Sequence, residues 1–95
     1  MMLFVRAPYC HMLRDGQKTI EVRWGPRYRK ITTGSVLSIN GRDRVRVTSV
    51  ERASAREASR RYHEIGCTSG REFLRALRSM GYRGGPLYLF HVRPL

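Results

Sequence analysis

Hydrophobic and polar residues alternate along much of the chain in a way that predicts short β-strands. Ile20, Val22 and Trp24 stand at every second position, which is typical of a strand with one buried face. Asn40-Gly41 is a turn signal between two further alternating segments. The last apolar run is nearly continuous, which favours a central place in a sheet. The predicted strands cover residues 2–6, 19–24, 35–40, 44–50 and 87–93.

Three other segments carry the spacing of helices. Pro8 suits the first turn of a short helix that Gly16 ends. Two further helices are predicted over residues 54–66 and 69–81, and each ends at a glycine. Both begin with a capping-box pattern, in which a serine precedes a glutamate by three residues. The two pairs are Ser54 with Glu57 and Ser69 with Glu72.

This order of elements predicts an α+β fold. Strands two to four follow one another through short turns, so a parallel α/β sheet with crossover helices is the weaker interpretation. We expect a small, partly open β-barrel of about five strands, with a short helix before the second strand and two helices before the last. With 95 residues, the chain is predicted to form one domain over residues 1–95.

The charge of the chain points to a class of partner. Nineteen Lys and Arg residues stand against seven Asp and Glu, which gives a formal net charge of +12 spread over both halves of the sequence. Like charges at this density destabilise a compact domain unless a polyanion or counterions relieve them, so nucleic acid is the expected partner. Adaptation to high temperature is the weaker explanation, because thermophile surfaces usually balance added cations with added acids.

The apolar segments and the cysteines indicate where in the cell the protein is expected. No apolar run approaches the length of a membrane span, and Arg6 interrupts the apolar N-terminus before a signal-peptide core forms. We therefore expect a soluble, cytoplasmic monomer with no membrane partner. Cys10 and Cys67 are too few for a disulfide framework and are expected to be reduced, buried side chains.

One motif carries specific chemistry. Gly16, Lys18, Glu21 and Arg23 form the pattern G-x-K-x-x-E-x-R where the first helix meets the second strand. The two-residue period of a strand puts Glu21 and Arg23 on one face, with Lys18 at the strand entry. Such a cluster grips phosphate or a base edge through its cations, while the carboxylate orients them or accepts a donor from the ligand. The alternative is a structural ion pair on a solvated strand face.

The motif and its surroundings resemble the ASCH domain, a small fold of the PUA-like superfamily. The resemblance implies a PUA-like β-barrel with a cleft beside the motif, and RNA-related roles: nucleic-acid binding, transcriptional coactivation or RNA processing. It implies that Lys18, Glu21 and Arg23 are the cleft residues. The residues that carry it are Ala7-Pro8-Tyr9, Leu13, Gly16, Lys18-Thr19, Glu21, Arg23, Gly34 and Val36.

Some members of this family are hydrolases, which makes an enzyme the alternative prediction. One branch resembles amidohydrolases that act on acetylated cytidine through a Lys, a Thr and a Glu. Lys18 matches that Lys, but Glu21 occupies the Thr position, and Glu64 aligns only loosely with the Glu. A ribonuclease would need an acid–base pair, which Lys18 and Glu21 would supply with help from His11.

Further cations and aromatics extend the predicted nucleic-acid surface. After the motif strand, Tyr28 is a candidate to stack on a base and the cations around it are candidates for phosphate contacts. Trp24 is instead expected in the core, because it shares a face with Ile20 and Val22. The predicted phosphate-binding residues are Arg27, Arg29 and Lys30 in the loop, and Arg42, Arg44 and Arg46 on the following hairpin.

Other charged groups receive less specific interpretations. The arginines of the two later helices are expected on solvated faces, partly paired with Glu57, Glu64 or Glu72. Cys10-His11 and His63-x-x-x-Cys67 contain the residue types of a zinc site, but neither has C-x-x-C spacing, so we expect no metal and no cofactor. A protein-interaction module with an acidic partner is a third hypothesis for the whole chain.

Overall fold

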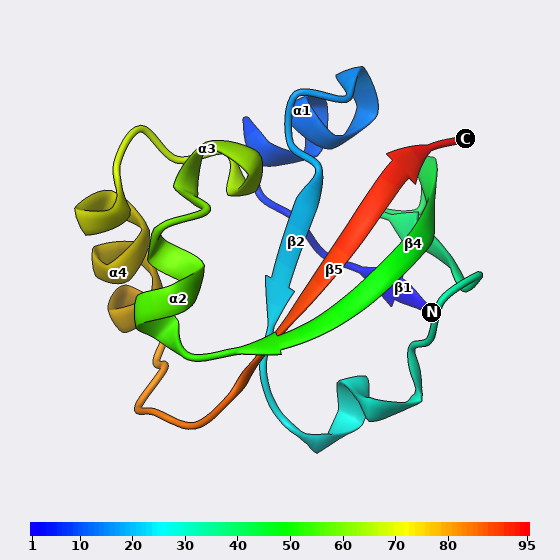
Figure 1. The fold of residues 1–95 in the computed structure, drawn as a ribbon. Coiled ribbons are helices and arrows are strands. Elements are labelled where there is room, and N and C mark those ends of the chain that lie inside the picture. Colours follow the sequence, from blue (N-terminus) through cyan, green and yellow to red (C-terminus); the bar gives the residue numbers. More distant parts are fainter.

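The computed structural model describes residues 1–95 and contains one five-stranded sheet (Figure 1). The strand order is β1-β3-β4-β5-β2, and every neighbouring pair is antiparallel except β1 with β3. This confirms the predicted α+β class and the central position of the last strand. The strands are β1 (Met2–Leu3), β2 (Ile20–Arg23), β3 (Val36–Ile39), β4 (Asp43–Ala53) and β5 (Leu87–Pro94). The helices are α1 (Tyr9–Asp15), the 3-10 helix η1 (Pro26–Lys30), α2 (Ala55–Ser59), α3 (Tyr62–Ile65) and α4 (Gly70–Ser79).

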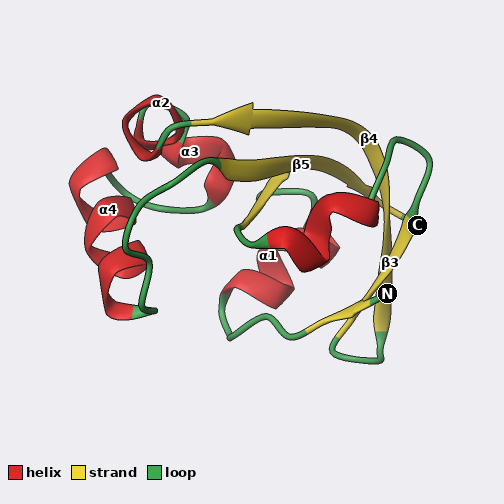
Figure 2. Ribbon diagram, turned by 90° about the horizontal axis from the view of Figure 1, so that it is seen from below, coloured by secondary structure: helices red, strands yellow, loops and turns green.

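The hydrophobic core lies on both faces of β5. Leu87 and Leu89 pack into a cluster that holds the buried side chains of α2, α3 and α4. Tyr88 and Phe90 face the other way, into a cluster formed with β1, β3, β4 and α1. Figure 2 shows α2, α3 and α4 gathered at one end of the molecule, apart from α1. Burial on both faces explains why the sequence of this strand is almost continuously apolar.

The predicted helix over residues 54–66 is in fact two short helices, α2 and α3. Its start is as predicted, because Ser54 and Glu57 form both hydrogen bonds of the capping box. At its end, Ser59 Oγ donates to the carbonyl of Arg56 at 2.6 Å, and the backbone amide of Arg61 bonds only three residues back. A serine hydroxyl that competes for a helical carbonyl, followed by tighter turns, ends a helix early.

The sheet is open, whereas the sequence predicted a partly open barrel. β1 and β2 are the two edge strands and do not pair with each other. β1 is only two residues long, and the chain after it leaves the sheet to enter α1. The segment after β1 is fixed by a side chain instead: Asn40 Nδ2 donates to the Val5 carbonyl, and Asn40 Oδ1 accepts from the Val5 amide, both at 2.8 Å. An opening therefore separates the segment after β1 from β2.

No helix of the chain has the length and apolar character that crossing a bilayer requires.

The contact between α2 and α4 predicts that a glycine-to-alanine change in a helix destabilises this protein. Alanine normally favours a helix over glycine by about 1 kcal/mol. At Gly70, however, a Cβ would lie 2.8 Å from the backbone carbonyl oxygen of Ser59. We therefore expect Gly70→Ala to lower the free energy of unfolding by roughly 1–3 kcal/mol, measured by urea denaturation. The neighbouring exposed change Arg71→Ala should stay within about 0.5 kcal/mol; equal stability of the two variants would contradict this packing.

Candidate functional site at the open edge of the sheet

A pocket of about 350 Å³ occupies the opening between the two edge strands. Three walls form it: the segment after β1, the edge strand β2, and helix α4 with the end of α3. Because β2 is an edge strand, side chains from both of its faces reach the pocket. Glu21 and Arg23 come from one face, and Val22 and Trp24 from the other. The full lining is Phe4, Val5, Arg6, Tyr9, Lys18, Glu21, Val22, Arg23, Trp24, Tyr28, Ile65, Cys67, Phe73, Ala76, Leu77 and Met80.

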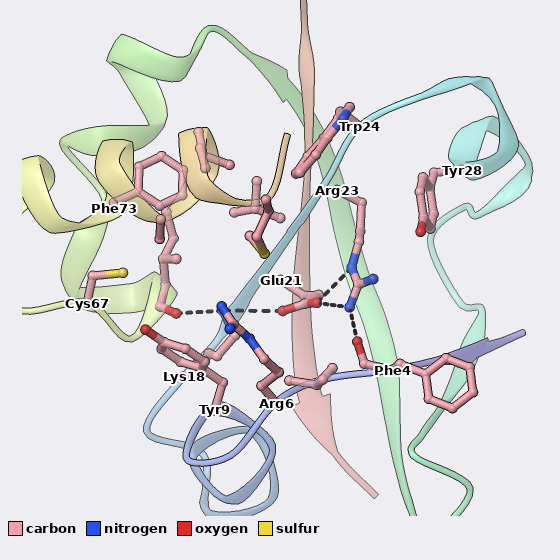
Figure 3. Close-up of a pocket in the computed structure, with 16 residues that line it drawn as sticks. Phe4, Arg6, Tyr9, Lys18, Glu21, Arg23, Trp24, Tyr28, Cys67 and Phe73 are labelled. Carbon is pink, nitrogen blue, oxygen red and sulfur yellow. Dashed lines mark hydrogen bonds and ion pairs between the residues drawn. The ribbon is translucent and has the colours of Figure 1, made fainter. Parts of the chain in front are cut away.

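The three charged residues of the motif form a row along one side of this pocket (Figure 3). Glu21 lies in the middle: its Oε1 is 3.3 Å from Lys18 Nζ, and its Oε2 accepts from Arg23 Nε at 2.8 Å and from Nη2 at 2.5 Å. Lys18 and Glu21 are only 5% and 6% exposed. The sequence prediction that these residues share one cluster is therefore correct in geometry. Their burial, however, rules out the alternative of an ion pair on a solvated face.

The end of α1 brings Lys18 into the row. Gly16 takes the left-handed conformation (φ 80°), and the amides of Gln17 and Lys18 both donate to the carbonyl of Met12. The ammonium group then donates to two backbone carbonyls, that of Ile20 at 2.7 Å and that of Ile65 at 2.5 Å. The ion pair with Glu21 adds to these two hydrogen bonds, so Lys18 is held by three groups of the protein.

Arg23 closes the other end of the row. Its Nη2 donates to the backbone carbonyl of Phe4 at 2.9 Å, so one side chain spans the opening from β2 to the segment after β1. Burial lowers the pKa of the guanidinium, but the charge and hydrogen bonds of Glu21 outweigh this effect and the pKa is raised. Arg23 therefore stays cationic, and with 20% of its side chain exposed it is the most accessible member of the row.

Apart from the exposed Arg6, the rest of the pocket lining is apolar or aromatic. Trp24 contacts Tyr82 edge to face, with ring centroids 5.4 Å apart. At the mouth, Phe4 is 75% exposed and Met80 is also exposed. On the wall near Lys18, burial raises the pKa of the Tyr9 hydroxyl and of the Cys67 thiol, so both stay protonated at neutral pH. A charged row beside apolar walls is the arrangement of a site for a flat ligand with one polar edge.

Sequence reasoning missed several of these pocket residues. Phe4 and Met80 were not predicted as site residues, although the two-residue period of a strand places Phe4 on the opposite face from Leu3 and Val5. Trp24 was expected in the core; it packs against the helical cluster but also lines the pocket. The outward position of Phe4 could thus have been predicted from the two-residue period of the strand. The position of Met80 could not, because it depends on how α4 packs.

The predicted loop residues separate into different environments. Tyr28 is 9% exposed and belongs to the core cluster, and only part of it reaches the pocket wall. The guanidinium groups of Arg23 and Arg27 lie 5.9 Å and 5.2 Å from the centroid of its ring. The sequence had suggested that this ring stacks on a base. In the structure it is not an open stacking surface, because it is buried and two guanidinium groups lie near it. Arg29 and Lys30 are exposed and lie outside the pocket.

The predicted hairpin cations also lie outside the pocket. Arg42 and Arg44 are exposed, while Arg46 is half-buried and donates to the carbonyl of Gly34 at 3.1 Å. The structure thus brings together Lys18, Glu21 and Arg23 and leaves the hairpin cations as separate surface groups.

Most of the cations have no carboxylate partner. Only four of the 19 lie within ion-pair distance of an acid: Arg14, Lys18, Arg23 and Arg61. None of the arginines of α2 and α4 forms the predicted ion pair with Glu57, Glu64 or Glu72; Glu64 pairs instead with Arg61, at the N-cap of α3. Glu57 caps α2, and Glu72 accepts from the amide and hydroxyl of Thr68. The unpaired arginines give the surface a strongly positive field.

Two other sequence hypotheses concern groups outside the row. The zinc ligands considered among Cys10, His11, His63 and Cys67 do not assemble, since no three His, Cys, Asp or Glu side chains lie close enough to hold a metal ion. His11, considered as a helper in catalysis, is exposed and does not line the pocket.

A second polar cluster joins β4, β5 and α3. Arg61 donates to Glu51 at 2.9 Å and to Glu64 at 3.0 Å, and Glu51 also bonds to His91. The hydrogen bond to His91 is the main cause that lowers the pKa of Glu51, with Arg61 adding to it. The hydrogen bonds and charge of Arg61 likewise lower the pKa of Glu64.

The buried row generates a stability prediction. Lys18→Met leaves Glu21 Oε1 and two carbonyls without their donor, and removal of one partner from a buried ion pair typically costs about 3–5 kcal/mol. We expect this loss in urea unfolding followed by circular dichroism. Lys30→Met, at an exposed lysine, is the matched control and should change stability by less than about 0.5 kcal/mol. If both variants unfold at the same urea concentration, Lys18 does not hold the site together.

The second cluster generates a pH prediction. Because the folded pKa of Glu51 is lowered, its stabilising contribution is present above the unfolded pKa of about 4.3 and disappears as the pH falls through the folded value. Glu51→Gln should therefore reduce the free energy of unfolding at pH 7, by up to about 1 kcal/mol because the groups are half-exposed. The difference from wild type should shrink progressively below about pH 4.3. A difference that persists undiminished far below about pH 4.3 would refute this assignment.

No curated protein matches this sequence, whereas solved structures match its fold along nearly the whole chain. A crystal structure of the hypothetical protein PH0355 is 19% identical, with a TM-score of 0.85 over 99% of this chain and 97% of the other. A solution structure of PF0455 from Pyrococcus furiosus is 21% identical, with a TM-score of 0.75 over 99% and 96%. A variant of ZmASCH from Zymomonas mobilis is 14% identical, with a TM-score of 0.73 over 99% and 73%.

The family comparison tests the resemblance that the motif suggested. The family model for the ASCH domain matches residues 3–90, which extend from the end of β1 to the middle of β5. The shared fold and this match agree with each other, and the chain therefore belongs to the ASCH domain family.

Proposed function

We propose that this protein binds single-stranded or looped nucleic acid, RNA in preference to DNA, by taking one unpaired base into the pocket. The observation that carries the proposal is a largely apolar and aromatic pocket that is lined by the charged row and by Arg6, in a protein of net charge +12. Proteins that read single-stranded RNA stack splayed bases on exposed rings and bond to the base edges. Phe4 at the mouth is such a ring, and Arg23 is the accessible donor beside it.

The charged row has a positioning role in this proposal. Lys18 and Glu21 are too deeply buried and too fully paired to meet a phosphate directly. They hold Arg23 at a fixed place on the pocket wall, and Arg23 contacts the polar edge of the base. A pre-positioned guanidinium loses less freedom on binding than a mobile surface side chain, which favours affinity.

The phosphates of the bound strand lie on the cations around the pocket. Arg27, Arg29 and Lys30 follow the pocket strand directly, and Arg42, Arg44 and Arg46 extend the positive surface along the hairpin. None of these six forms an ion pair with an acid, so their charge is available to a polyanion. Affinity should consequently fall steeply with salt, since each neutralised phosphate of a single strand releases counterions.

The same contacts favour binding over hydrolysis of RNA or of a modified nucleoside. A general base needs a free lone pair within reach of the substrate. Both carboxylate oxygens of Glu21 already face cations, and Lys18 donates to two backbone carbonyls while it pairs with Glu21. An acidic protein partner would use the surface cations but would leave the pocket without a ligand.

Fluorescence anisotropy with labelled single-stranded RNA tests the proposal. Phe4→Ala should weaken binding by roughly five- to a hundredfold, because base stacking on an aromatic side chain contributes about 1–3 kcal/mol. Leu74→Ala is the control, since Leu74 is an exposed apolar residue of α4 outside the pocket. Equal affinity of the two variants, or no binding of RNA or DNA at low salt, would overturn the proposal. RNA recovered intact after long incubation is the expected result, whereas cleavage would favour the hydrolase alternative.

A further inference from the structure

A second hollow lies directly beside the base pocket. It has a volume of about 390 Å³ and is built from the turn after β2, the end of β4 and the loop before β5. Trp24 lines both the pocket and this hollow, so the two cavities share this residue. The full lining is Trp24, Gly25, Pro26, Arg29, Arg52, Gly84, Gly85, Pro86 and Tyr88.

The charge of this hollow is purely positive. Arg29 and Arg52 line it, no acidic residue does, and neither arginine forms an ion pair elsewhere. Arg52 lies over the ring of Tyr88, with its guanidinium carbon 5.2 Å from the ring centroid. This stacking restricts the side chain without using its N–H donors, which stay available to an anion.

The opposite wall is a glycine loop that leaves room for close approach. Gly84 and Gly85 have φ values of 133° and 91°, and no atom lies within 4 Å of where a Cβ would stand on either residue. Tyr82 fixes the loop, because its hydroxyl donates to the Gly85 carbonyl while its ring contacts Trp24. A backbone without side chains opposite two guanidinium groups suits a tetrahedral anion such as phosphate.

We propose that this hollow binds the phosphodiester group next to the base held in the pocket. The inference rests on the proposed function and deepens it: the strand crosses the edge of Trp24, with its base on one side and its phosphate on the other. Arg52 thereby becomes a binding residue, although the sequence analysis named it neither as a site residue nor as a phosphate contact. The ligand class is a nucleotide within a strand, because a free nucleoside would occupy the pocket alone.

A charge-matched comparison tests this inference. Arg29→Gln/Arg52→Gln should weaken binding of a labelled RNA tetranucleotide by roughly ten- to a hundredfold at low salt, given the usual strength of hydrogen bonds to charged groups. It should also make the plot of log K against log salt concentration less steep by about 0.7, because each phosphate contact to a single strand contributes about that much to the slope. Arg71→Gln/Arg75→Gln removes the same charge from exposed positions of α4 outside both hollows and should lose far less.

A change in the ligand provides the second measurement. Tetranucleotides with one neutral methylphosphonate linkage, tested at each position in turn, should bind the wild-type protein most weakly when the neutral linkage stands at one particular position. The Arg29→Gln/Arg52→Gln variant should be insensitive to that position, and this holds even if the variant is less stable. If the wild type binds RNA but the two double variants weaken equally and no linkage stands out, the phosphate site is refuted and the base pocket stands. If the wild type binds no strand at all, both proposals fail.

Discussion

The carboxylate of Glu21 is the group on which the rest of the site depends. A buried carboxylate is stable only when donors replace the water that it has lost, and Lys18 and Arg23 do so from opposite sides. Each cation also holds the backbone of another segment, Lys18 at the end of α3 and Arg23 after β1. One side chain therefore links three parts of the chain that no strand pairing joins. These parts are the walls of the pocket.

The open sheet and the pocket are two consequences of the same construction. If β1 paired with β2, backbone hydrogen bonds would fill the place that the Arg23 guanidinium now spans. Because the edge stays open, β2 presents both of its faces to one cavity, which explains how a charged row and a tryptophan can share it. Inward-pointing charges at an edge strand also hinder pairing with another chain. The row thus protects the edge as well as shaping the site.

Local signals predicted the parts of this structure that depend on neighbouring residues. The two-residue period placed Glu21 and Arg23 on one face, and Gly16 marked the end of α1 that directs Lys18. Contacts between distant segments were not predictable in the same way. The break after Ser59, the burial of Tyr28 and the exposure of Met80 each depend on how a helix packs against the sheet. The burial of the row was missed for the same reason: Ile65 and Phe4 lie far from it in sequence.

The acidic residues explain why the excess of arginine cannot be neutralised within the protein. Glu21 is committed to the pocket, Glu57 and Glu72 to the starts of helices, and Glu51 and Glu64 share Arg61. Few carboxylates are left to approach the other arginines, so rearrangement of the surface would not relieve their repulsion. A polyanion would relieve this repulsion without a rearrangement of the protein, because the cations would keep their positions. In the proposed function, a strand that neutralises some of these cations also brings a base to the pocket, where the exposed ring of Phe4 offers a stacking surface.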